Sequence, residues 1–286
     1  LISKEVTFCS NTYHPLPVVL KKGNGVFVWD VNNKKYFDYL SAYSAVNQGH
    51  CNKQILNTFI KQAKKLTLTS RAFYNNELGS SLEYITSVFG YEKMLPMNSG
   101  AEAVETAIKI SRKWGYEVKK VQHNKAKIIV CNGNFHGRTT TVVSFSSHNE
   151  SRENFGPLTG GFETINYNDS VSLEKKLKID KNIVGFLVEP IQGEGGVVVP
   201  DDGYLSICKK LCEKYNVLFI ADEIQTGVCR TGELLACHHE NIKADITILG
   251  KALAGGFYPV SGVLTSKKIM NVMKVGHMVQ HSEEIP

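Results

Sequence analysis

The sequence lacks several features that would assign it to a specialised class. It contains no run of about 18 or more apolar residues, and its first residues, LISKEVTFCS, do not form a secretory signal. The seven cysteines form no CxxC pair, and no second group of ligands accompanies Cys237, His238 and His239. These absences predict a soluble protein with free thiols in a reducing compartment, without a membrane partner and without a metal site.

The basic charge is not gathered into one segment. The formal net charge is +6, but the lysines are scattered along the chain, for example Lys21, Lys22, Lys64, Lys65, Lys119, Lys120, Lys175 and Lys176. They are not interleaved with aromatic residues as in a nucleic-acid-binding segment. We therefore expect solvated helix faces and no nucleic-acid partner. With 42% hydrophobic residues in 286, the chain has enough apolar material for one large domain or slightly more.

Short apolar segments rich in β-branched residues recur through the second half of the sequence. Those that predict buried strands are residues 127–131, 184–189, 217–222 and 246–249. They are almost continuously hydrophobic, which is typical of strands covered on both faces. Residues 204–215 have apolar positions at helical spacing and lie between two of these strands. The alternation predicts an α/β fold with a mostly parallel central sheet and helices on both faces.

The first part of the chain predicts a different local structure. Residues 26–39 consist of two β-rich runs joined at Asn32 and Asn33, which predicts a hairpin. We expect an N-terminal segment with this hairpin over residues 1–44 and a large ligand-binding domain over residues 45–286. A long helix is predicted to run towards Trp114, with Ser99 or Asn98 as its cap.

Lys251 follows one predicted strand and Asp222 ends another, at the edge where α/β enzymes place ligand-binding loops. Glycine and small residues surround Lys251, and a partly desolvated lysine there can form a Schiff base with an aldehyde. Asp222 ends a buried strand, and a carboxylate there suits the protonated ring nitrogen of pyridoxal. Taken alone, an ordinary loop lysine and a capping aspartate explain the two residues as well.

Two further segments suit a flat, phosphorylated ligand. Ser99, Gly100 and Ala101 begin a helix whose first amides are unpaired and can bind a phosphate, although many such helix ends bind only water. Phe135 can stack on a ring or pack in the core. Arg138 can clamp a substrate carboxylate or form a structural ion pair.

Five motifs together resemble the class III aminotransferases, which depend on pyridoxal phosphate. In order they are MNSGAEAVETAIK, NFHGRT, VEPIQGEGG, IADEIQTGVCRTG and LGKALAGGFYPVSGVL. Within the family, the segments TYHPLPV, SAYSAVNQGHC, LTLTSRAFYN and NFGPLTGGF are most similar to members that act on ornithine. The resemblance covers nearly the whole chain and implies the large domain of a fold-type I transferase.

The resemblance also implies a role for individual residues. Lys251 would carry pyridoxal 5'-phosphate and move the proton, and Asp222 would pair with the ring nitrogen. Gln225 would bond the ring hydroxyl, Phe135 would stack on the ring, and Ser99, Gly100 and Ala101 would hold the phosphate. The residues implied for the substrates ornithine and 2-oxoglutarate are Tyr13, Tyr43, Arg138 and Glu194.

The sequence departs from the family pattern at its end. After residue 276 the family's GEHGSTYGGNP-like segment is replaced by HMVQHSEEIP. We therefore expect the small C-terminal domain to be missing, and with it the arginine that would pair with Glu194.

Three alternatives to transfer from ornithine stay open. They are an acetylornithine aminotransferase, a 4-aminobutyrate aminotransferase, and a non-catalytic relative that binds the cofactor or partners full-length subunits. The family implies a homodimer or a higher homo-oligomer. Either the mitochondrial matrix or the cytoplasm is expected as the compartment.

Overall fold

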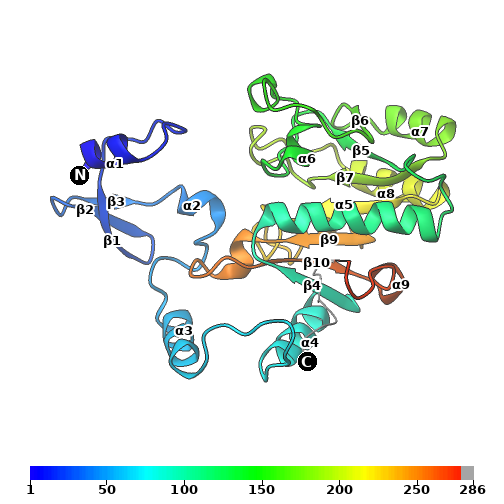
Figure 1. Cartoon of the computed structure of the whole chain (residues 1–286). Coiled ribbons are helices and arrows are strands. Elements are labelled where there is room, and N and C mark those ends of the chain that lie inside the picture. Colours follow the sequence, from blue (N-terminus) through cyan, green and yellow to red (C-terminus); the bar gives the residue numbers. More distant parts are fainter. Residues whose placement is uncertain (278–286) are drawn as a thin grey trace.

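A seven-stranded sheet forms the centre of the chain in the computed structural model, which describes residues 1–277 (Figure 1). Its strand order is β4-β10-β9-β8-β7-β5-β6. The strands are β4 (Lys93–Met97), β5 (Lys127–Cys131), β6 (Phe162–Ile165), β7 (Ile183–Val188), β8 (Leu218–Asp222), β9 (Ile246–Leu249) and β10 (Ser261–Thr265). The strands from β9 to β6 are parallel to one another, whereas β10 is antiparallel to both β9 and β4. The predicted mostly parallel sheet is thus confirmed.

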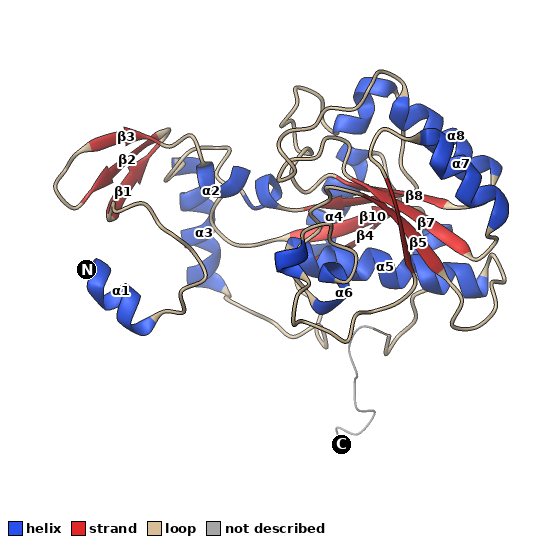
Figure 2. Cartoon of the chain, turned by 90° about the horizontal axis from the view of Figure 1, so that it is seen from above, coloured by secondary structure: helices blue, strands red, loops and turns tan. Residues whose placement is uncertain are grey.

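Helices cover both faces of this sheet (Figure 2). On one face lies α5 (Gly100–Glu117), and its apolar residues pack with Ile128, Val184 and Ile220 in one core cluster. On the other lie α7 (Ser170–Ile179) and α8 (Tyr204–Lys214). Because side chains alternate along a strand, the neighbouring residues of the same strands turn to this second face. The alternation of side chains along the strands therefore gives one core cluster on each face of the sheet, and a third, smaller cluster includes Leu249 and Leu264.

The N-terminal part forms a small sheet of its own, which lies to the left in Figure 1. Strands β1 (Leu20–Asn24), β2 (Phe27–Asp30) and β3 (Lys35–Phe37) are antiparallel, so the predicted hairpin is confirmed as β2–β3. The carboxylate of Asp30 stabilises its turn by accepting hydrogen bonds from the amides of Asn32 and Lys34 and from the hydroxyl of Tyr36. The division of the chain at residue 44 stays a prediction.

Short elements connect these parts. The remaining helices are α1 (Ile2–Phe8), α2 (Ser41–Ser44), α3 (Lys53–Lys65), α4 (Leu78–Phe89), α6 (Thr140–Val143), α9 (Lys267–Met270) and the 3-10 turns η1 (Asn149–Ser151), η2 (Ala236–Glu240) and η3 (Lys251–Ala254). Within residues 1–277, no helix combines the length and the apolar character that crossing a membrane requires. Most of the expected departure at the end of the chain, residues 278–286, lies outside the described residues.

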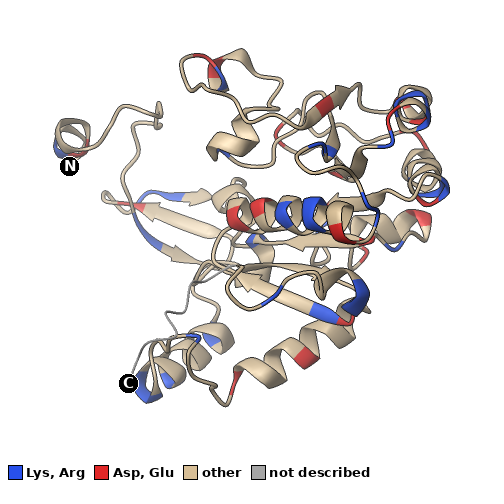
Figure 3. Ribbon diagram, turned by 45° about the vertical axis from the view of Figure 1, so that its right-hand side comes forward, with Lys and Arg blue, Asp and Glu red and all other residues tan. Residues whose placement is uncertain are grey.

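Basic and acidic residues are interspersed along the helices and loops of the chain (Figure 3). On α5, for example, Lys113 pairs with Glu117 one turn later at 2.5 Å. On α8, Lys209 lies 3.2 Å from Glu213 in the same spacing. The net positive charge is thus carried by helix faces of mixed sign, as the scattered lysines predicted.

Candidate active site

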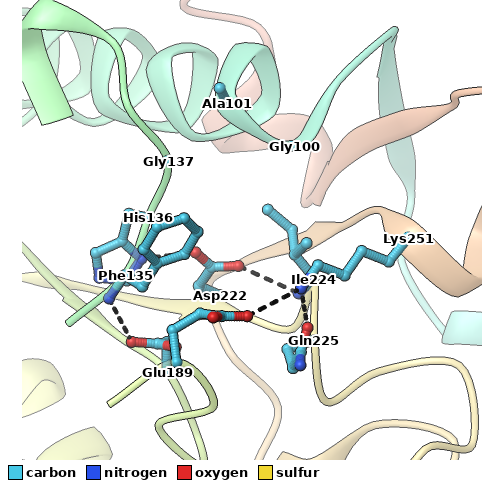
Figure 4. A pocket seen from close by; sticks show the side chains of 11 residues that line it. Gly100, Ala101, Phe135, His136, Gly137, Glu189, Asp222, Ile224, Gln225 and Lys251 are labelled. Carbon is cyan, nitrogen blue, oxygen red and sulfur yellow. Dashed lines mark hydrogen bonds and ion pairs between the residues drawn. The ribbon is translucent and has the colours of Figure 1, made fainter. Parts of the chain in front are cut away.

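Loops from four neighbouring strands meet the N-terminus of α5 in one pocket (Figure 4). The loops follow β5, β7, β8 and β9, whose carboxyl ends share one edge because the strands are parallel. The pocket is lined by Gly100, Ala101, Phe135, His136, Gly137, Glu189, Glu194, Asp222, Ile224, Gln225 and Lys251. The structure thus brings together most of the residues that the sequence predicts for a cofactor.

Lys251 enters the pocket from the turn after β9. Its backbone adopts a φ of +42°, an unusual conformation for a residue with a side chain. Its ammonium donates a hydrogen bond to Oε1 of Gln225 and lies 3.9 Å from Oε1 of Glu194. Burial lowers the pKa of Lys251 below its usual value, although the nearby carboxylates oppose this shift. A larger fraction of the free amine, the nucleophilic form, is the consequence.

Asp222 lies at the floor of the pocket and is paired with a histidine. Its Oδ2 atom lies 2.6 Å from Nδ1 of His136, and its Oδ1 accepts the amide of Ile224 at 3.1 Å. Both side chains are almost fully buried, at 3% exposure of each residue. Burial alone would lower the pKa of His136, but the hydrogen bond and charge of Asp222 raise it above its usual value. The two side chains therefore hold each other in a fixed position inside the protein.

His136 was not predicted as a functional residue. The sequence shows it only as one residue of the loop after β5, next to Phe135. Its contact with Asp222 depends on the sheet order, in which β5 and β8 lie on the two sides of β7. Its second ring nitrogen, Nε2, is buried without a hydrogen-bond partner among the described residues.

Glu189 is a second buried acid beside this pair. It follows β7, is 6% exposed, and accepts the amide of Phe135 at 2.9 Å. Burial raises the pKa of Glu189 to about 7, the nearby charge of His136 opposes the shift, and Asp222 adds to it. Near neutral pH this carboxyl group therefore exchanges a proton readily.

The N-terminus of α5 forms the opposite wall. Ser99 caps the helix, because its Oγ accepts the amide of Glu102 at 3.3 Å and its own amide donates to the Glu102 carboxylate at 2.8 Å. Gly100 and Ala101 line the pocket at the first helical positions, where amides have no partner within the helix. Ser99 itself lines an adjoining hollow that also includes Gly100 and Lys251.

The residues that the resemblance implies for substrate binding do not all lie in the pocket. Glu194 lines the pocket. Arg138 is exposed, with its guanidinium 5.9 Å from the ring centre of Phe135. Tyr43 lies in α2, which packs against η3, and Gln225 donates to the hydroxyl of the adjacent Ser44 at 3.4 Å. Tyr13 lies between α1 and β1, is 62% exposed, and does not line the pocket.

No group of three or more metal-ligating side chains gathers anywhere in residues 1–277. The seven cysteines are free thiols, four of them buried. The chemistry of the pocket instead rests on an amine of lowered pKa, buried acids, an aromatic ring and free helix amides.

Relatives with known names share this architecture. The chain is 57% identical over 274 residues to the "Ornithine aminotransferase, mitochondrial" of Drosophila melanogaster, covering 96% of this chain and 63% of that protein. A solved structure of the ornithine aminotransferase of Toxoplasma gondii, described with partial occupancy of PLP at its active site, matches with a TM-score of 0.95 and 48% identity over 96% of this chain and 64% of that one. The acetylornithine aminotransferase of Elizabethkingia anophelis matches with a TM-score of 0.86 and 54% identity over 99% of this chain and 67% of that one.

The chain thus spans about two thirds of the length of the curated relatives that it matches. The family described as "Aminotransferase class-III" matches residues 8–282, which is nearly the whole sequence. With the five sequence motifs, the parallel sheet and the pocket at its carboxyl edge, this match shows that the chain belongs to the class III aminotransferases.

Proposed function

We propose that the chain is the large part of an ornithine aminotransferase, which transfers the δ-amino group of ornithine to 2-oxoglutarate. The products would be glutamate 5-semialdehyde and glutamate. The observation that carries the proposal is the presence of Lys251, with its lowered pKa, in the same pocket as the buried Asp222–His136 pair. The identity with named ornithine aminotransferases supports the choice of substrate.

The pocket fits pyridoxal 5'-phosphate in its chemistry and its shape. Asp222 would face the ring nitrogen, Gln225 the ring hydroxyl, and Phe135 one face of the ring. The free amides at the N-terminus of α5 suit a phosphate. The absence of a side chain at Gly137 leaves space beside them, because a Cβ added there would lie 3.2 Å from the Cβ of Ala101. When bound, the cofactor supplies an aldehyde that takes up the amino group and a ring that withdraws electrons from the reacting carbon.

The residues of this chain supply positioning and proton transfer. As a free amine, Lys251 can hold the cofactor and take a proton from the substrate carbon at its Nζ atom. His136 holds the Asp222 carboxylate in place and keeps it from turning towards other donors. Phe135 and Ile224 line the pocket from opposite sides in Figure 4, where their apolar surfaces exclude water from the space above Asp222.

For the substrates we propose Arg138, Tyr43 and Glu194. Arg138 forms no ion pair with the described residues, so its guanidinium is available to clamp a carboxylate of 2-oxoglutarate in a bidentate way. Glu194 lies close enough to Lys251 to attract the amine of ornithine. Arg138, Tyr43 and Tyr13 do not line the pocket itself, and the roles proposed for the two tyrosines rest on the resemblance alone.

We propose that the protein assembles as a homodimer or a higher homo-oligomer. Large apolar side chains are exposed along the first 84 residues, as a contact surface requires. The most exposed of them are Phe8, Leu16, Tyr39, Leu68 and Tyr74. Sedimentation of the purified chain tests this, and a monomer at all concentrations contradicts it. For the compartment, the mitochondrial matrix and the cytoplasm stay the two predictions, and the name of the Drosophila relative favours the first.

A visible absorbance spectrum of the purified chain with pyridoxal phosphate tests the proposal. We expect a cofactor band that depends on Lys251 and that is lost when ornithine is added. Lys251→Ala should abolish the band, whereas Lys268→Ala, at an exposed position of α9, should leave it unchanged. A band that does not respond to ornithine contradicts the proposed activity and favours the non-catalytic alternative.

A second candidate function is the transfer of an amino group from acetylornithine, favoured by the 54% identity to the Elizabethkingia enzyme. The same spectral assay with ornithine, acetylornithine and 4-aminobutyrate as separate donors distinguishes these substrates. Ornithine should discharge the band at the lowest concentration. A tenfold preference for acetylornithine, about 1.4 kcal/mol in transition-state binding, would replace our assignment with the second one.

A further inference from the structure

Glu189 lies where the loop that carries Phe135 meets the loop that carries Glu194. It is the first residue after β7, and β7 lies between β5 and β8 in the sheet. The loop after β5 (residues 132–138) carries Phe135, and the loop after β7 (residues 190–196) carries Glu194. Its carboxylate has no lysine, arginine or histidine nitrogen within 4 Å in the described part of the chain, so its partners are backbone groups.

The side chain of Glu189 contacts both loops at once. Its Oε2 accepts the amide of Phe135 at 2.9 Å, and its Oε1 accepts the amide of Gly193 at 3.4 Å. Its backbone carbonyl is held in turn by the hydroxyl of Tyr167 at 3.0 Å. Figure 4 shows the carboxylate below Phe135, with its hydrogen bond to the Phe135 amide as a dashed line. One carboxyl group thus fixes an amide in each loop.

We propose that Glu189 is a positioning residue that joins the Phe135 loop to the Glu194 loop, so that the aromatic ring and the acid face the same pocket. This role goes beyond the proposed function, in which Glu189 holds neither the cofactor nor a substrate.

The alternative explanation is a buried acid that serves only the geometry of its own strand end. Against it stands the cost of burying a carboxyl group without a cation, which a neutral or apolar residue would avoid. The acceptor atoms of Glu189 point away from its own strand, to amides four residues ahead and in another loop. Without them, two buried amides would lose their acceptors, and each loop would be free to turn away from the pocket.

Hydrogen–deuterium exchange of the chain without cofactor tests directly whether Glu189 holds the two loops together. In Glu189→Leu, which has a similar size and no acceptor, the amides of Phe135 and Gly193 should exchange about tenfold faster. Glu189→Gln keeps a carbonyl oxygen that can accept the Phe135 amide, so exchange there should stay within about threefold of the original chain. The matched control Glu83→Leu, at an exposed position of α4, should change neither amide.

A second measurement, in the presence of pyridoxal phosphate, distinguishes a positioning role of Glu189 from a general effect on stability. The visible circular dichroism per bound cofactor reports how the ring is held in its asymmetric surroundings. It should fall in Glu189→Leu and be restored in Glu189→Gln. If Glu189→Leu does not fold, Glu189→Asp takes its place, because its shorter side chain loses the reach to Phe135.

Two results would overturn the proposal. One is unchanged exchange at Phe135 and Gly193 in the folded variant without an acceptor. The other is faster exchange spread evenly over β5 and β7, which would show a general loss of stability. The exchange experiment needs no cofactor. If the chain binds no cofactor, the proposed function fails, but the exchange result for Glu189 remains valid.

Discussion

Nδ1 of His136 lies 2.6 Å from Oδ2 of Asp222, and both side chains are buried beneath the pocket. His136 lies in the loop after β5 and Asp222 is the last residue of β8, on the other side of β7, so their contact ties the ends of β5 and β8 together. A charge-assisted hydrogen bond of this length is stronger than a neutral one. Because the acid has no lysine or arginine partner in residues 1–277, the histidine is what compensates its burial.

We expect His136→Phe to lower the free energy of unfolding by about 3 kcal/mol, because it leaves the Asp222 carboxylate buried without a partner. Urea unfolding of the cofactor-free chain measures this loss. The matched control is His148→Phe, at an exposed position, which should stay within about 0.5 kcal/mol of the original. In the double variant with Asp222→Asn the loss should be smaller than the sum of the two single losses, and strict additivity would show that the two side chains do not interact.

A pH dependence follows from Glu189. Its pKa in the folded protein is about 7, above the ordinary value of 4.5, so the folded state binds the proton more tightly than the unfolded state. The contribution of protonated Glu189 to the free energy of unfolding is fully present below pH 4.5 and is lost as the pH rises through 7. This difference in proton affinity corresponds to roughly 3 kcal/mol.

Glu189→Gln should remove this dependence. Both proteins retain His136 and Asp222, the titratable groups that face Glu189, so the difference between their unfolding free energies isolates the carboxyl group. We expect the original chain to lose stability relative to the glutamine variant between pH 5 and pH 8. Parallel curves over that range would mean that Glu189 is ionised throughout.

The close approach of the Phe135 loop to α5 requires a glycine at one position. Gly137 has a φ of +116°, and a Cβ there would lie 3.2 Å from the Cβ of Ala101. Gly137→Ala should therefore cost about 1–3 kcal/mol of stability and weaken the binding of pyridoxal phosphate. Gly160→Ala is the control, since its Cβ would meet nothing within 4 Å. Equal stability and equal cofactor affinity of the two variants would show that position 137, next to α5, tolerates a side chain.

The strands of the sheet core could be predicted because they are hydrophobic on both faces. Residues 127–131 and 246–249 were predicted with the bounds that β5 and β9 have in the structure. β4, β6 and β10 were not predicted, and each breaks the pattern: β4 contains Pro96, β6 contains Glu163, and β10 contains Gly262. The antiparallel pairing of β10 with β4 and with β9 is a tertiary arrangement that no local pattern encodes.

The site was predictable as far as its residues follow strand ends. Lys251 and Phe135 follow strands and Asp222 ends one, and the carboxyl ends of parallel strands share one edge, so their meeting in one pocket follows from the fold. The contact of His136 with Asp222 could not be predicted, because it depends on which strands are neighbours. The role of Glu189 was hidden for the same reason, since its partners lie in other loops.

The reactivity of Lys251 provides a test that needs no cofactor. Burial lowers its pKa, so near pH 8 a larger fraction of Lys251 than of an ordinary lysine is the free amine. In reductive methylation with formaldehyde, followed by peptide mass spectrometry, Lys251 should react faster than the exposed Lys268 although only 22% of its side chain is accessible. The advantage should shrink as the pH rises and both amines lose their protons.

A carboxylate variant tests the physical cause of this reactivity. The negative charge of Glu194, 3.9 Å from the Lys251 ammonium, opposes the lowering of its pKa. Glu194→Gln should therefore lower the pKa further and speed the methylation of Lys251 by about two- to fivefold, whereas the exposed Glu233→Gln should have no effect. Slower methylation in Glu194→Gln would mean that the carboxylate orients the amine for reaction, and the electrostatic account of Lys251 would then be wrong.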